Sequence, residues 1–154
     1  IHALTLRHPA TPNLAATRSA MLLDYGDSVR ANITVNHGHN FGTRHQESYV
    51  KWEGARGAIK AQLGLLMNYP AGGDDYLEQC ALDENGRPGP WRQIPVEGSW
   101  YPHAFIGTMA SLMRFANGET TELPTRVEDA CRTMAVVEAA YQSSAAGGTP
   151  IPSS

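Results

Sequence analysis

Residues 28–36 read SVRANITVN, and their alternation determines how the first part of the chain is expected to fold. Every second side chain from Val29 to Val35 is apolar, and the side chains between them are polar or charged. Successive side chains of a β-strand point to opposite faces, so this pattern predicts a half-buried strand. The preceding stretch, SAMLLDYGDS (residues 19–28), alternates in phase and ends in Gly26 and Asp27, which predicts a hairpin over residues 19–36.

Similar alternation recurs before and after this hairpin. It is seen in HALTLRH (2–8), HQESYVKWEG (45–54), GAIKAQLG (57–64) and YLEQCALDENGRPGPWRQIPVE (76–97). The last stretch contains the pair Asn85 and Gly86, which favours a tight primed turn. We therefore predict about six to eight mostly antiparallel strands over residues 2–97.

The rest of the chain changes to a helical period. Apolar residues recur at intervals of three and four from residue 102 to residue 117, and Gly118 follows as a helix stop. A second helix is predicted over residues 126–146, with Thr125 as its cap three residues before Glu128. The apolar stripe expected on this second helix consists of Val127, Ala130, Cys131, Met134, Val137 and Tyr141. Residues 149–154 are expected to form an extended tail.

These patterns predict a single α+β domain over residues 1–154. We expect an open-faced, predominantly antiparallel (mixed) sheet with the two C-terminal helices packed on one face. The opposite face is expected to be polar, and either solvated or covered by a partner. Its residues are Arg30, Asn32, Thr34, Lys51, Glu53, Lys60 and Gln62.

The composition excludes several classes of protein. The 154 residues carry a formal net charge of -3, and their twelve Lys and Arg are scattered, so we expect no nucleic-acid binding. No apolar run approaches the length of a membrane-spanning helix. Cys80 and Cys131 fall in apolar patterns and are expected to be buried free thiols of a cytoplasmic protein.

Residues 36–45, NHGHNFGTRH, hold three of the six histidines. A divalent metal could be bound by His37, His39 and His45, but the nearest acids belong to the following strand. A polar interstrand loop is the simplest alternative. A third interpretation is a substrate-facing rim, because imidazole, amide and guanidinium groups suit a polyhydroxylated or anionic ligand. The candidate residues for that rim are His37, His39, Asn40, Arg44 and His45.

A second polar and aromatic stretch is WYPHAF (residues 100–105), at the expected start of the first helix. Helix N-termini favour negative groups, so Trp100, Tyr101 and His103 are further candidates for substrate contact. A packing role for these residues is the alternative. The chain contains no dinucleotide fingerprint, phosphate-binding loop or nucleophile elbow, and we assign it no catalytic residue and no metal.

The end of the chain, HAFIGTMASLMRFANGETTELPTRVEDACRTMAVVEAAYQSSAAGGTPIP (residues 103–152), is predicted to contain an aromatic-led helix, an Asn-Gly stop, a Pro and acidic helix start and an Ala-rich helix. This order of features resembles the C-terminal domain of the Gfo/Idh/MocA family of NAD(P)-dependent oxidoreductases. The stretch HQESYVKWEGARGAIKAQLG (residues 45–64) is similar to the family's pair of strands joined by a Gly-x-x-Gly turn.

This resemblance implies a longer parent protein. A preceding Rossmann domain, which is absent from these residues, would bind NAD or NADP, and this chain would bind substrate and form a homo-oligomer through its open sheet face. The parent would transfer hydride between a sugar, polyol or related hydroxyl substrate and the nicotinamide. The family's catalytic Glu-Lys-Pro and Asp-x-x-x-His segments do not occur here, so the chain alone is expected to be inactive. The alternatives are a free-standing ligand- or metal-binding module that uses His37, His39 and His45, and a purely structural role.

Overall fold

The computed structural model describes residues 1–9, 11–14, 16–37, 44–64, 72–99 and 103–147. The chain divides into two compact units, and each is described by itself. Unit 1 contains residues 1–40 and 125–154, and unit 2 contains residues 41–124. Our expectation of one domain over residues 1–154 stays a prediction.

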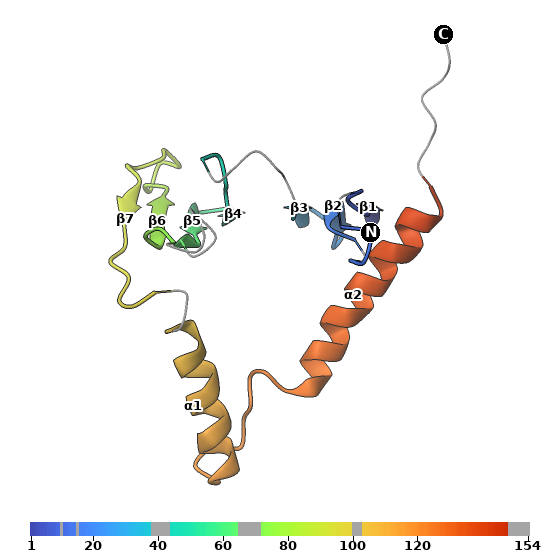
Figure 1. The fold of residues 1–154 in the computed structure, drawn as a ribbon. Helices are drawn as coiled ribbons and strands as arrows, with labels where there is room; N and C mark the ends of the chain where they lie inside the picture. Colours follow the sequence, from blue (N-terminus) through green and yellow to red (C-terminus); the bar gives the residue numbers. More distant parts are fainter. Residues whose placement is uncertain (10, 15, 38–43, 65–71, 100–102, 148–154) are drawn as a thin grey trace. The chain divides into compact units, whose positions relative to one another are not determined.

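The described residues form an α+β structure with open antiparallel sheets, which confirms the predicted class (Figure 1). The elements are β1 (His2–Leu6), β2 (Arg18–Asp24), β3 (Arg30–Asn36), β4 (Tyr49–Gly54), β5 (Gly57–Gln62), β6 (Tyr76–Ala81), β7 (Arg92–Gln93), α1 (Ala104–Ala116) and α2 (Val127–Ala145). The described strands form two sheets, ordered β1-β2-β3 and β4-β5-β6-β7, where we predicted one. Alternation identifies strands but does not say which strand edges pair.

The hairpin predicted in unit 1 is confirmed. Strand β2 pairs with β3 from Arg18 opposite Asn36 to Asp24 opposite Arg30. Gly26 and Asp27 make the turn with φ angles of 85° and 48°. The N–H of Gly26 donates to the Asp24 carboxylate over 3.0 Å, which stabilises this left-handed backbone.

The register of β1, β2 and β3 separates their side chains by residue number. Residues directly opposite each other share a face, so the odd-numbered side chains lie on one face and the even-numbered side chains on the other. On the odd-numbered face Leu23 is only 6% exposed, whereas the neighbouring Leu22 on the even-numbered face is 42% exposed. Helix α2 lies along β1 (Figure 1), and Ala140 of α2 is 3% exposed. The core of unit 1 therefore lies on the odd-numbered face.

Helix α2 also closes the outer edge of β1 by hydrogen bonds. The N–H groups of Ala3 and Thr5 donate to the hydroxyls of Ser143 and Ser144 over 3.0 and 2.9 Å. The Ser144 hydroxyl also donates to the Thr5 carbonyl. An exposed strand edge is a template for pairing with another chain, so these serines satisfy and shield that edge.

One detail predicted for α2, its N-cap, is wrong. The helix begins one residue later than expected, with Arg126 as its N-cap and no side-chain capping hydrogen bond, so Thr125 lies outside the capping position. The predicted apolar stripe is exposed, with Val127 at 69% and Met134 at 61%. Cys131 on this stripe is also exposed. The helix contacts β1 through small and hydroxyl residues instead, because the strand edge requires hydrogen-bond acceptors at close range.

Two tight turns connect the strands of unit 2. Gly54 and Gly57 flank the turn between β4 and β5, as predicted for the Gly-x-x-Gly pattern, and a Cβ on Gly57 would lie 2.4 Å from the Cys80 carbonyl oxygen. The expected primed turn at Asn85 and Gly86 is wrong, because of the two only Gly86 has a positive φ. The carboxylate of Asp83 accepts the N–H groups of Asn85 and Arg87 and so selects a different turn.

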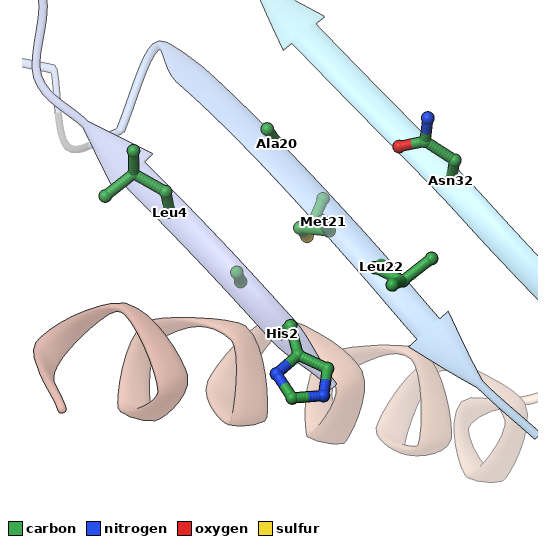
Figure 2. Close-up of a pocket in the computed structure, with 7 residues that line it drawn as sticks. His2, Leu4, Ala20, Met21, Leu22 and Asn32 are labelled. Carbon is green, nitrogen blue, oxygen red and sulfur yellow. The ribbon is translucent and has the colours of Figure 1, made fainter. Parts of the chain in front are cut away.

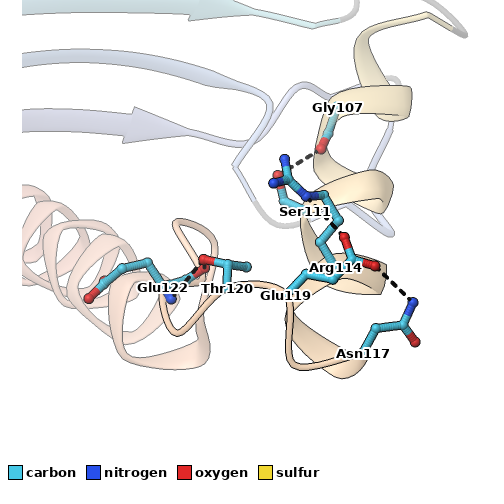
Figure 3. Close-up of polar contacts among 7 residues, drawn as sticks. All are labelled: Gly107, Ser111, Arg114, Asn117, Glu119, Thr120 and Glu122. Carbon is cyan, nitrogen blue, oxygen red and sulfur yellow. Dashed lines mark hydrogen bonds and ion pairs between the residues drawn. The ribbon is translucent and has the colours of Figure 1, made fainter.

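Helix α1 agrees with the predicted helix, and Gly118 follows its C-cap, Asn117, as expected. Gly118 has a φ of 74°, and the N–H of Glu119 donates to the Arg114 carbonyl over 2.9 Å. The Glu119 carboxylate lies 3.4 Å from the Nε of Arg114 and accepts a hydrogen bond from the Asn117 amide over 3.4 Å. Figure 3 shows these three side chains at the end of α1. None of the residues of α1 is buried. The packing of α1 on a sheet face stays a prediction.

Replacement of both Ser143 and Ser144 by Ala should open the outer edge of β1. We expect the free energy of unfolding to fall by about 1 kcal/mol for each lost hydrogen bond. The amides of Ala3 and Thr5 should also exchange with solvent faster. Urea unfolding and hydrogen exchange measure these effects. Thr133→Ala is the matched control, because the Thr133 hydroxyl bonds only within α2, and its effect should stay within about 0.5 kcal/mol. Unchanged exchange at Ala3 and Thr5 would contradict this role.

Candidate functional site

Thr17 joins three segments of the chain at one end of the sheet in unit 1. It is 5% exposed and directly precedes β2. Its N–H donates to the Leu6 carbonyl over 3.1 Å, and its carbonyl accepts the N–H of His37 over 2.7 Å. Its hydroxyl accepts the N–H of His8 over 3.0 Å. The end of β1, the start of β2 and the end of β3 are therefore fixed against one another at this residue.

His8 is the buried histidine of this end of the sheet, with 7% of its surface exposed. Its carbonyl accepts the N–H of Thr11 over 3.0 Å, which begins the connection from β1 to β2. His8 and Thr17 were not among the candidates from the sequence. No sequence spacing predicts that His8 and His37 are connected, because both bind Thr17 by hydrogen bonds that depend on the pairing of the strands. The one signal in the sequence was the strand-like alternation of residues 2–8, which continues past residue 6 as far as His8.

The predicted His-rich rim is only partly within the described residues. His37 follows β3, lies at the Thr17 junction and is exposed. Arg44 and His45 belong to unit 2 and are exposed. His39 and Asn40 lie outside the described residues. The structure therefore brings His37 together with Thr17 and His8, and the rest of the predicted rim stays a prediction.

His103 lies at the start of α1, as the sequence predicted. Its Nδ1 accepts the N–H of Ser99 over 3.0 Å and lies 2.9 Å from the Ser99 hydroxyl. A backbone N–H can only donate, so the proton of a neutral His103 is at Nε2. Gly98 has a φ of 83°, and a Cβ added to it would lie 3.1 Å from the Cβ of His103 and 3.2 Å from the Cγ of its ring. These contacts give His103 a local structural role; Trp100 and Tyr101 lie outside the described residues.

The even-numbered face of unit 1 carries a shallow depression over β1 and β2 (Figure 2). Figure 2 shows His2 and Leu4 of β1 beside Ala20 and Leu22 of β2, with Asn32 of β3 at the far side. The leucines are exposed, at 56% for Leu4 and 42% for Leu22. The depression is mostly apolar, and His2 is the ionisable side chain among the residues that line it.

The sheet of unit 2 has one polar face, which the strand register defines. Its polar residues in β4, β5 and β6 are Tyr49, Lys51, Glu53, Lys60, Gln62, Tyr76 and Glu78, and Ala58 and Cys80 share the face. This confirms that the unit 2 residues predicted for the open face share one face. The ammonium of Lys60 lies 5.3 Å from the centre of the Tyr49 ring, within range of a cation–π interaction.

Two pKa values are shifted on this polar face. The Tyr76 hydroxyl donates to the Glu78 carboxylate, and this hydrogen bond raises the pKa of Tyr76 above its ordinary value. The hydrogen bond from Lys51 to Glu53 raises the pKa of Lys51 in the same way. Both groups therefore keep their protons at neutral pH and cannot serve as general bases there.

The described part of the chain contains no group of three or more His, Cys, Asp or Glu side chains placed to hold a metal ion. The metal alternative depends on His39, which the structure does not describe, so it stays a prediction. Among the described helices, none is long and apolar enough to span a membrane.

Comparison of the chain with protein-family models, with curated proteins and with solved structures gives no match.

Proposed function

We propose that this chain is the substrate-binding and oligomerisation domain of an NAD(P)-dependent oxidoreductase of the Gfo/Idh/MocA type. The observation that carries the proposal is the Thr17 junction, which fixes His37 and the start of the His-rich stretch at one end of a sheet. Rigid elements that present polar side chains at an edge are suited to orient a substrate. The strand pair joined by Gly54 and Gly57 also has the local structure that the resemblance implies.

The proposed reaction divides its tasks between two domains. A secondary hydroxyl carbon loses a hydride to the oxidised nicotinamide and its hydroxyl loses a proton to a base, which gives a carbonyl and NADH or NADPH. A dinucleotide-binding domain of the same protein would hold the cofactor and the base. This chain would orient substrate hydroxyls by hydrogen bonds. The proposed contact is His37; the other candidates from the sequence, His39, Asn40, Arg44, His45, Trp100, Tyr101 and His103, stay predictions.

Steady-state kinetics of the complete gene product test this function. The protein should reduce NAD or NADP with a sugar or polyol, and a panel of such compounds would be screened by the absorbance of the reduced nicotinamide. His37→Ala should raise KM about tenfold, the effect of a lost hydrogen bond to substrate. His2→Ala, at the far end of β1, should leave KM unchanged. No dinucleotide binding by the complete protein would contradict the proposal.

We further propose that the polar face of unit 2 is an interface with a second copy of the chain. Lys51, Lys60 and Glu78 lie side by side across β4, β5 and β6. In a two-fold dimer the two copies of this row would lie against each other and run in opposite directions. The lysines of one copy would then lie opposite the glutamate of the other. A face that contains both signs of charge favours such self-association.

Charge reversal tests this interface by sedimentation velocity. Glu78→Lys should convert the oligomer to monomer, because the row of each copy would then carry three cations and repel the row of the other. The double variant with Lys60→Glu and Glu78→Lys exchanges the two charges and should restore the oligomer. Glu84→Lys in the exposed turn after β6 is the control and should have no effect. A wild-type chain that stays monomeric at high concentration would contradict the interface.

The cytoplasm is the compartment that we propose for the protein. Cys80 and Cys131 are both free thiols, which a reducing compartment preserves. Cell fractionation tests this placement.

A further inference from the structure

Arg18 presents a polar atom that no described group satisfies. The residue is half-buried, and its Nε is buried with no hydrogen-bond partner. Nearly all buried polar groups in proteins are hydrogen-bonded, and a buried charge without a partner is costly. An unsatisfied guanidinium nitrogen at a fixed position in a strand therefore calls for an explanation.

The surroundings of Arg18 offer it no carboxylate. Its side chain lies on the even-numbered face, between Leu6 of β1 and Asn36 of β3. The carboxylates of this sheet and its turns are Asp24 and Asp27, at the opposite end of β2. Asp24 lies six residue steps along the extended strand from Arg18, a distance of about 20 Å.

The carboxylates of α2 are already engaged elsewhere. Glu128 lies 3.9 Å from Arg126, and Asp129 lies 3.2 Å from Arg132. Glu138 accepts a hydrogen bond from Gln142. Within the described part of unit 1, no carboxylate therefore pairs with Arg18.

We propose that Arg18 binds an oxyanion, a carboxylate or a phosphate, of the ligand. The inference rests on the proposed function, and it narrows the substrate from any polyol to one with an acidic group, such as a sugar acid or a sugar phosphate. A guanidinium presents paired N–H donors that match the two oxygens of such a group, and Arg18 directly follows the Thr17 junction. The anion would be held at Arg18 while the hydroxyls of the same ligand extend toward His37. The side chain of Asn36, opposite Arg18 on the same face, supplies a further donor.

The experiment follows the Nε–H resonances of the arginines by ¹H–¹⁵N NMR of the purified 154-residue chain. Gluconate, inorganic phosphate and the neutral polyol glucitol are titrated separately. Arg18 should shift saturably with gluconate or with phosphate and should not shift with glucitol. The anion that binds more tightly identifies the source of the charge, because gluconate offers a carboxylate with hydroxyls and phosphate offers the bare anion.

Variants assign the binding to Arg18. Arg18→Gln should weaken anion binding at least about tenfold, as expected for a charge-assisted hydrogen bond. Arg30→Gln is the matched control, because Arg30 lies on the same face at the opposite end of the sheet, across from Asp24, and should leave the affinity unchanged. Arg18→Lys keeps the charge but loses the planar pair of N–H donors, so it should weaken binding several-fold. This variant decides the case if circular dichroism shows that Arg18→Gln does not fold.

Three results of the titrations would overturn the inference: equal weakening by Arg18→Gln and Arg30→Gln, unchanged affinity in Arg18→Gln, or glucitol binding as tight as gluconate binding. The proposed function can fail separately. Anion binding at Arg18 in a complete protein without dinucleotide chemistry would retain this site and overturn the oxidoreductase. Oxidation of a neutral polyol with the same KM in Arg18→Gln would retain the oxidoreductase and overturn this site.

Discussion

The pairing register of β1, β2 and β3 is the constraint on which the rest of unit 1 depends. Side chains alternate between faces with a period of two, so a slip of one residue would move each side chain of a strand to the other face. Leu23 would then leave the core, and Ala3 and Thr5 would no longer present their N–H groups to Ser143 and Ser144. The hydrogen bonds of Thr17 to Leu6, His8 and His37 hold the register at the end where the candidate site lies. One set of backbone contacts thus determines both the core and the position of the functional groups.

The same register gives the candidate site its electrostatic character. Arg18 lies at one end of the even-numbered face and Asp24 at the other, so the two charges are kept apart on a single strand. Asp24 is placed across from Arg30 and also caps the hairpin turn through Gly26. Arg18 has no carboxylate opposite it in the sheet, its Nε has no hydrogen-bond partner, and the residue directly follows Thr17 in the chain. An unpaired, partly buried guanidinium lowers the stability of the free chain, and anion binding restores that stability.

Much of this structure follows from the sequence, and the exceptions have identifiable causes. Strand alternation located the hairpin at Gly26 and Asp27, and the helical period located α1 and its stop at Gly118. The apolar stripe predicted on α2 is exposed, because helical period shows which residues share a face but not what the face contacts. The helix meets a strand edge there, where the hydroxyls of Ser143 and Ser144 matter more than apolar area.

The candidate site was harder to predict for a related reason. His37 was found because histidines cluster near it in the sequence, whereas His8, Thr17 and Arg18 meet it only through strand pairing. Pairing between distant segments leaves no spacing pattern in a single sequence. The polar face of unit 2 was predictable, because each strand by itself shows which of its side chains are polar.

A structure of the complete gene product with bound dinucleotide and gluconate would test the central claim most directly. The account predicts that the carboxylate of the ligand lies on the Arg18 guanidinium, with a ligand hydroxyl within hydrogen-bonding distance of His37 and the nicotinamide facing that hydroxyl's carbon. A ligand bound elsewhere, with Arg18 and His37 in contact with solvent alone, would contradict it.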